Sequence, residues 1–166
     1  MEAAKDIVFR PVKTEDLQKN PDEITRLLYE NYRLNFPGKG GLHEFAESRY
    51  KDMIRFCKDG SAMLIGAFVD RKIIGFLWAY KRSFLGETRL HISEIAVDSA
   101  YRGQGVGTKL LDCIEKIAFD EGIQTMELMA TKENENVIRF YEKQGFYVTR
   151  LQFEKKVKDR GENRLS

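Results

Sequence analysis

The spacing of apolar side chains in the first half of the chain predicts one strand, two helices and a hairpin. Residues 7–11 read as a short strand ended by proline, and residues 21–35 and 43–58 repeat apolar side chains three and four positions apart, as helices do. A proline and three glycines in residues 36–41 separate the two helices. Residues 62–69 are almost entirely apolar, and residues 70–72 turn the chain into a second strand at 73–80.

The second half alternates strands and helices. We expect a strand at residues 89–97, a helix from Gly105 to about Gly122, a strand at 125–130, a short helix at 137–144 closed by Gly145, and a last strand region at 147–157. The order β-α-α-β-β-β-α-β-α-β predicts a mixed α/β sheet with an antiparallel start and one β-α-β crossover. We expect one domain over residues 1–157, followed by a loosely ordered charged tail at 158–166.

The junction after the strand that ends at Val97 carries the clearest chemistry. Gly103, Gly105 and Gly107 stand at alternate positions, directly after Arg102 and at the start of a helix. Glycine lets a backbone approach a ligand closely, and the first amides of a helix lack partners inside it. Together with the helix dipole and the arginine, these amides predict a site for a phosphate or pyrophosphate.

Two other glycine-rich phosphate loops do not fit these residues. A P-loop requires Gly-Lys-Ser/Thr five residues after its first glycine, but Thr108 and Leu110 occupy those places after Gly103 and Gly105. A dinucleotide fingerprint requires Gly-x-Gly-x-x-Gly, and Thr108 and Leu110 again stand where its third glycine belongs.

The pattern that does fit is Arg-x-x-Gly-x-Gly directly after a strand ending in Ala-Val-Asp. A second pattern follows downstream: Asn134, then a short helix carrying Phe-Tyr-Glu at 140–142, then Gly145-Phe146. The two patterns together resemble the signatures of the GNAT superfamily of N-acetyltransferases. The resemblance covers roughly residues 7–156 and is specific from about residue 92 to 146. It implies the GNAT-type fold and acetyl-CoA as the acetyl donor.

The resemblance also assigns residues to acetyl-CoA. The glycine loop would hold the pyrophosphate, the backbone of the preceding strand would pair with the pantetheine amides, and Asn134 would bind the pantetheine or a nearby water. The implied set is Ile95, Ala96, Val97, Arg102, Gly103, Gln104, Gly105, Val106, Gly107, Thr108 and Asn134. A purely structural interpretation stays open, because glycines and Thr108 often cap helices and Asn134 is a good N-cap for the short helix.

Two side chains are candidates for the catalytic chemistry. The matching tyrosine of the family, here Tyr141, would give a hydrogen bond or proton to the leaving thiolate. Glu94 is the one charged residue at 92–97, on the face opposite Ile95 and Val97, and would remove the amine proton directly or through water. The alternatives are a core aromatic for Tyr141 and a solvent-facing carboxylate for Glu94. His91 is a second candidate base.

The acceptor amine should contact the two early helices and their connection. Tyr32, Arg33 and Phe36 are the leading candidates, among further aromatic and basic side chains at Tyr29, Lys39, His43 and Phe45. Aromatic rings beside cations would suit a ligand with an apolar body and an anionic group. For any one of these residues a role in the core or in solvation is the simpler interpretation, and the sequence does not identify the acceptor.

Composition narrows the function further. There are 28 basic and 26 acidic residues, a net charge of +2, which argues against nucleic-acid binding. The two histidines exclude a multi-histidine metal site, and Cys57 and Cys113 lack metal-like spacing, so we expect no metal and reduced thiols. No apolar leader or membrane-length apolar run is present, so we expect a cytoplasmic protein without a membrane partner.

The sequence therefore predicts an enzyme that transfers acetyl from acetyl-CoA to a small-molecule or peptide amine in a ternary complex. A covalent acyl-enzyme is not expected, since the predicted site holds no cysteine. Two alternatives stay open: a non-catalytic acyl-CoA-binding or sensor module, and an acetyltransferase acting on protein N-termini or lysines. A homodimer paired through the β-rich C-terminal end is a further expectation from the resemblance.

Overall fold

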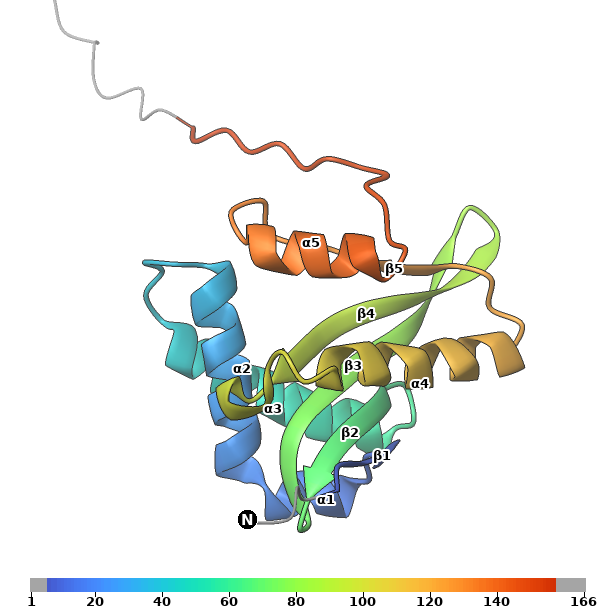
Figure 1. Ribbon diagram of the computed structural model, residues 1–166. Helices are drawn as coiled ribbons and strands as arrows, with labels where there is room; N and C mark the ends of the chain where they lie inside the picture. The colour runs from blue at the N-terminus through green and yellow to red at the C-terminus, as the bar shows by residue number, and fades with distance from the viewer. Residues whose placement is uncertain (1–5, 158–166) are drawn as a thin grey trace, which may run out of the picture.

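The computed structural model describes residues 6–157 and shows a five-stranded sheet with helices on both faces (Figure 1). The strands follow one another in chain order across the sheet. All neighbours are antiparallel except the last pair, which is parallel. Their bounds are β1 Val8–Pro11, β2 Met63–Val69, β3 Lys72–Phe84, β4 Glu87–Val97 and β5 Met126–Leu128. The mixed sheet predicted from the sequence is confirmed.

The helices form two groups, one on each face of the sheet (Figure 1). The first group packs against β3 and β4 and contains α1 Thr14–Lys19, α2 Pro21–Asn35 and α3 Leu42–Lys58. The second contains α4 Val106–Asp120, which connects the parallel strands β4 and β5, and α5 Glu135–Lys143. A 3-10 turn at Ser99–Tyr101 precedes the glycine loop.

Strand alternation sends side chains into two separate cores. Along β3, Phe76 and Trp78 join the core under α1–α3, whereas Leu77 and Ala79 join the core under α4. The same alternation fixes which side of β4 carries chemistry. Glu94 and Ala96 face α1–α3, whereas Ile95 and Val97 pack toward α4.

A β-bulge interrupts β4 just before its functional end. Trp78 pairs with Glu94 and Ala79 pairs with Ile92, which leaves Ser93 without a partner on β3. The extra residue shifts the alternation, so Ile92 and Glu94 lie on opposite faces although they are two positions apart. Without the bulge, Glu94 would face α4 together with Ile92.

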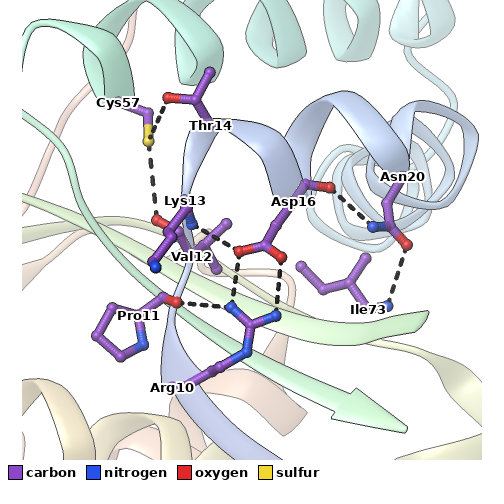
Figure 2. Close-up of polar contacts among 9 residues, drawn as sticks. All are labelled: Arg10, Pro11, Val12, Lys13, Thr14, Asp16, Asn20, Cys57 and Ile73. Atoms are coloured by element: carbon purple, nitrogen blue, oxygen red, sulfur yellow. Dashed lines mark hydrogen bonds and ion pairs between the residues drawn. The ribbon is translucent and has the colours of Figure 1, made fainter. Parts of the chain in front are cut away.

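The sequence analysis missed α1, which depends on side-chain contacts. The Arg10 guanidinium donates to both carboxylate oxygens of Asp16, at 2.7 and 2.8 Å, and the same carboxylate accepts from the Lys13 amide at 2.9 Å (Figure 2). Asn20 then joins α1 to the sheet, because it donates to Asp16 O and accepts from the Ile73 amide. A helix of six residues is too short to show a clear apolar period.

The hairpin of β3 and β4 is longer than predicted. Pairing continues to Phe84 and Glu87, and Leu85 and Gly86 make a two-residue turn with positive φ at both positions. The added residues carry few apolar side chains, so the pattern gave no sign of them. By contrast β5 spans only residues 126–128 of the predicted 125–130.

The predicted last strand is wrong. Residues 147–157 are not a strand, and their apolar side chains are exposed: Tyr147, Val148, Leu151, Phe153 and Val157. An apolar alternation becomes a strand only where a neighbouring strand and a core accept it, and no strand pairs with this segment within residues 6–157. The predicted tail at 158–166 lies outside the described residues.

Candidate active site

Glu94 lies inside the protein, not on an open face of the sheet. Its residue is 8% exposed. Oε1 accepts a hydrogen bond of 2.5 Å from the Tyr32 hydroxyl and lies 3.6 Å from Arg49 Nε, while Oε2 accepts from the Asn31 amide at 3.3 Å. The interpretation of Glu94 as a solvent-facing carboxylate is therefore wrong. Helices α2 and α3 both contribute partners to it.

Burial and hydrogen bonding act on this carboxylate in opposite directions. Burial has the largest effect and raises the pKa of Glu94 above its usual value, whereas the Tyr32 hydroxyl, Arg49 and Asn31 lower it. The pKa of Tyr32 is raised strongly by burial and by the charge of Glu94, so the phenol keeps its proton and donates. A carboxylate with a raised pKa at a dry position suits a general base.

The first acceptor candidate, Tyr32, lies inside the protein beside Glu94. The residue is only 4% exposed, and its hydroxyl is used by Glu94. Phe45 packs on its ring at 4.8 Å. Tyr32 is thus a direct partner of the carboxylate and not a free surface contact. Arg33 and Phe36, the other two candidates, are exposed near the C-terminal end of α2.

Sequence reasoning missed Arg49. Its position on α3 lies between the buried Ala46 and Met53 at helical spacing, so it belongs to the inward stripe of that helix. An arginine on an otherwise apolar stripe is the signal that could have found it. Asn31 was missed as well, since nothing in the local pattern links it to a residue 63 positions away.

Tyr141 is fixed by the way α5 ends. The amides of Gly145 and Phe146 donate to Glu142 O and Tyr141 O, and Gly145 has a φ of 88°. This is a Schellman motif, and the Phe146 ring packs edge-on against Tyr141 at 5.6 Å, as the motif favours. The predicted C-cap glycine is confirmed.

The Tyr141 phenol lies within electrostatic reach of Glu94. Burial has the largest effect and raises the pKa of Tyr141 strongly, and the negative charge of Glu94 raises it further. The two proposed catalytic side chains come from different elements and belong to opposite faces of the sheet.

Asn134 caps α5 and also reaches α2. Its Oδ1 accepts from the Val137 amide at 3.3 Å, and its Nδ2 donates to Asn35 Oδ1 at 2.9 Å. Asn35 in turn donates to Asn31, the partner of Glu94. The N-cap interpretation is confirmed, and a ladder of amides runs from α5 across α2 to the carboxylate.

The open edge of β4 lies beside these residues. β5 pairs only with Leu90, His91 and Ile92, so in the described chain residues 93–97 have no strand on that side. On their other side, Ile95, Ala96 and Val97 pair with β3. A free strand edge can pair with amides of an extended ligand.

The glycine loop follows this edge directly. Gly103 and Gly105 have φ of 72° and 78°, which glycine adopts without strain. Lys109 is the first residue after them whose amide donates to a backbone carbonyl, that of Gly105. Within residues 6–157, backbone hydrogen bonds leave the amides of 103–108, including Gln104 and Val106, unused. Such amides can bind an anion.

Other residues of the loop have structural contacts of their own. Arg102 Nε donates to Val97 O at 2.9 Å, and its guanidinium lies 3.8 Å from Glu30. A Cβ at Gly107 would stand 3.1 Å from the Phe140 ring, and Thr108 Oγ1 accepts from Gln144 at 3.1 Å. The glycine at 107 therefore lets α4 pack closely against α5.

His91 is engaged away from Glu94. Its Nδ1 lies 3.2 Å from Glu127 Oε1, and its ring packs against Tyr80. Among the residues that the structure describes, no group of three or more His, Cys, Asp or Glu side chains could hold a metal ion. In the same part of the chain, no helix has the length and apolar character needed to cross a membrane.

Comparisons with known proteins agree on the class of protein, the N-acetyltransferases. The chain is 27% identical over 135 residues to an uncharacterized N-acetyltransferase of Archaeoglobus fulgidus, covering 74% of this chain and 84% of that protein. It is 26% identical over 129 residues to a mycothiol acetyltransferase of Propionibacterium freudenreichii, covering 76% of this chain but only 41% of that longer relative.

The fold and the family agree with this class. The structure superposes on an aminoglycoside acetyltransferase from an uncultured soil metagenomic sample with a TM-score of 0.71 and 19% identity, covering 92% of this chain and 99% of that one. That identity supports the fold alone. Residues 23–146 match the model of the acetyltransferase (GNAT) family. The chain belongs to this family and is an N-acetyltransferase, which confirms the resemblance based on the two motifs.

Proposed function

We propose that the protein transfers an acetyl group from acetyl-CoA to a primary amine by direct attack in a ternary complex. The observation that carries the proposal is the buried carboxylate of Glu94, held by Tyr32 and Arg49 beside the free edge of β4. The amine nitrogen attacks the thioester carbon and the carbon–sulfur bond breaks. Glu94 accepts the amine proton, directly or through water, and Tyr141 supplies a proton to the departing thiolate.

The environment of each side chain supports its role. Glu94 is buried and its pKa is raised, which strengthens it as a proton acceptor. Tyr141 has a raised pKa and keeps its proton at neutral pH, so it is available as a donor. Neither role needs a covalent intermediate, and positioning of the two substrates would supply much of the acceleration.

Acetyl-CoA would bind along the edge of β4 and into the glycine loop. Unused amides at 103–106 and the dipole of α4 suit the pyrophosphate, and the free edge at 95–97 suits the pantetheine amides. Arg102 would add a positive charge at the mouth of the loop. At Gly103 and Gly105 a Cβ would meet nothing within 4 Å, so no packing contact requires glycine there, and the positive φ of both positions is what favours it.

The acceptor is proposed as a small-molecule amine, with a peptide amine as the alternative. Similarity to proteins named as mycothiol and aminoglycoside acetyltransferases favours screening small molecules first. Arg33 and Phe36 remain the exposed candidates for contacting it. Because acetyl-CoA is an intracellular metabolite, the proposal implies a cytoplasmic enzyme. Exposed apolar side chains at 147–157 would support pairing of two copies in a homodimer.

Calorimetric titration tests the donor site. The protein is titrated with acetyl-CoA, dephospho-CoA and pantetheine in parallel. Binding that weakens sharply for pantetheine, which lacks the diphosphate, supports the loop as its site, whereas equal binding of all three contradicts it. Thiol release in the presence of an amine panel then separates an enzyme from a sensor module, since a sensor binds acetyl-CoA and releases no thiol.

A further inference from the structure

Arg49 occupies an unusual place for an arginine. It projects from the inward stripe of α3 toward the sheet, and its side chain is 20% exposed. Such a position normally carries an apolar residue, because burying a charge is costly unless the charge is paired. An arginine at this position therefore needs partners that offset the cost of burying its charge, and its contacts supply them.

Three contacts hold the guanidinium in place. It stacks over the Trp78 ring at 4.2 Å from the centroid, Nη2 donates to Ser93 Oγ at 2.8 Å, and Nη1 lies 3.5 Å from Asp52. Trp78 and Ser93 flank Glu94 in the sheet, one across on β3 and one before it in the bulge. Stacking on Trp78 fixes the plane of the Arg49 guanidinium, and the hydrogen bond to Ser93 fixes its rotation within that plane.

In that orientation the fourth contact follows. Arg49 Nε lies 3.6 Å from Glu94 Oε1, the oxygen that also accepts from Tyr32. Oε2 receives only the longer contact from Asn31. The partners of Glu94 are thus unequal: one oxygen is anchored by a cation and a phenol, and the other has only the longer hydrogen bond from Asn31.

We propose that Arg49 is a positioning residue for Glu94: it keeps the carboxylate charged and turned so that Oε2 faces the acceptor amine. The inference rests on the proposed function, in which Glu94 is the base. The other groups that contact the carboxylate are the Tyr32 hydroxyl and the Asn31 amide, both from α2, and the charge of Glu94 also acts on the Tyr141 phenol of α5. None of the three carries a positive charge. Arg49 is the cation that balances Glu94.

The test follows the Glu94 carboxyl directly by carbon-13 NMR of glutamate-labelled protein, with Glu94→Gln to assign the signal. Arg49→Met removes the charge but keeps an apolar stem against Trp78, and Arg49→Lys keeps the charge without the planar fork. Arg55→Leu is the matched control, because Arg55 is on the same helix and also pairs with Asp52, but is 65% exposed.

Arg49→Met should move the Glu94 titration midpoint to higher pH and lower turnover about tenfold at neutral pH. Arg49→Lys should leave the midpoint near wild type but still lose turnover, and Arg55→Leu should change neither. An unmoved midpoint in Arg49→Met overturns the proposal. If that variant does not fold, wild-type turnover of Arg49→Lys overturns it. Wild-type turnover of Glu94→Gln would instead refute the base role itself, independently of Arg49.

Discussion

The Tyr32 hydroxyl donates a 2.5 Å hydrogen bond to Glu94 Oε1, which joins a helix residue to a strand residue 62 positions away in the sequence. The contact joins α2 to β4 at the point where β4 loses its neighbour β5. Because the phenol is buried and keeps its proton, it acts as a permanent donor to the carboxylate. The proton affinity of the proposed base thus depends on a residue outside its own strand.

Tyr32→Phe should make Glu94 harder to ionise. The hydroxyl lowers the pKa of Glu94, so its loss raises that pKa and shifts the acidic limb of the pH–activity profile to higher pH. Loss of a hydrogen bond to a charged group should also reduce the free energy of unfolding by about 2 kcal/mol. Kinetics across pH and urea unfolding measure the two effects.

Tyr50→Phe is the matched control for Tyr32→Phe. The Tyr50 hydroxyl donates to Leu17 O at 3.0 Å, so the variant also loses one hydroxyl hydrogen bond, here between α3 and α1. It should cost about 1 kcal/mol of stability and leave the acidic limb in place. If the acidic limb of the pH–activity profile lies at the same pH in Tyr32→Phe and Tyr50→Phe, the coupling between Tyr32 and Glu94 is contradicted.

Burial of Glu94 should appear in the pH dependence of stability. Its folded-state pKa is raised above the ordinary value of 4.5, so the folded state binds the proton more tightly than the unfolded state. The contribution of Glu94 to stability is therefore full below that pH and is lost as pH rises through the folded pKa. The free energy of unfolding of wild type minus that of Glu94→Gln should therefore fall as pH rises from 4.5 through the folded-state pKa of Glu94.

Urea unfolding of both proteins at a series of pH values measures this difference. Asp16 and Glu127 have lowered pKa values, and their contributions run in the opposite direction. They are common to wild type and Glu94→Gln, so the subtraction removes them. A difference that rises with pH would mean that Arg49 and Tyr32 outweigh burial.

Local pattern and motif spacing predicted more of the proposed acetyl-CoA site than of the proposed site for the acceptor amine. The loop at 102–108, the free end of β4 and the cap at Asn134 depend on residues near one another in sequence. Glu94 could be placed on the correct face because Ile95 and Val97 follow it directly, although the bulge at Ser93 was invisible.

What could not be predicted depends on contacts between distant elements. Arg49 and Asn31 reach Glu94 from two helices, and each helix shows only an ordinary amphipathic period. Tyr32 was selected as an aromatic side chain for the acceptor, and its hydrogen bond to a carboxylate on another element was not foreseen. The strand predicted at 147–157 was wrong for the opposite reason: the local pattern is clear, but no strand in the described chain pairs with this segment.

Tyr141→Phe should lower turnover about a hundredfold while leaving acetyl-CoA affinity within about twofold. The ring keeps its packing against Phe140 and Phe146, and only the hydroxyl is lost. Since the pKa of Tyr141 is raised, the ratio of wild-type to variant rates should stay constant from pH 7 to about pH 10. Single-turnover kinetics and calorimetry measure the two quantities, and wild-type turnover would exclude the acid role.

Gly105 offers a sharper test of the donor site than any charged residue. It has φ of 78° and open space around it, so Gly105→Ala should cost about 1 kcal/mol through backbone strain alone. Gly105→Glu adds the same strain and places a carboxylate where the pyrophosphate is proposed to lie. We expect acetyl-CoA binding to be lost in that variant, with a thermal unfolding transition close to that of Gly105→Ala.

Gly60 at the end of α3 provides the control for this pair, because it has φ of 77° and equally open surroundings. Gly60→Glu should lose stability as Gly105→Glu does, yet bind acetyl-CoA with wild-type affinity. Strain is common to both positions, so a difference in affinity isolates the added charge at the start of α4. Undiminished affinity in Gly105→Glu would show that the amides of 103–108 do not hold the diphosphate, and the loop would then be a helix cap alone.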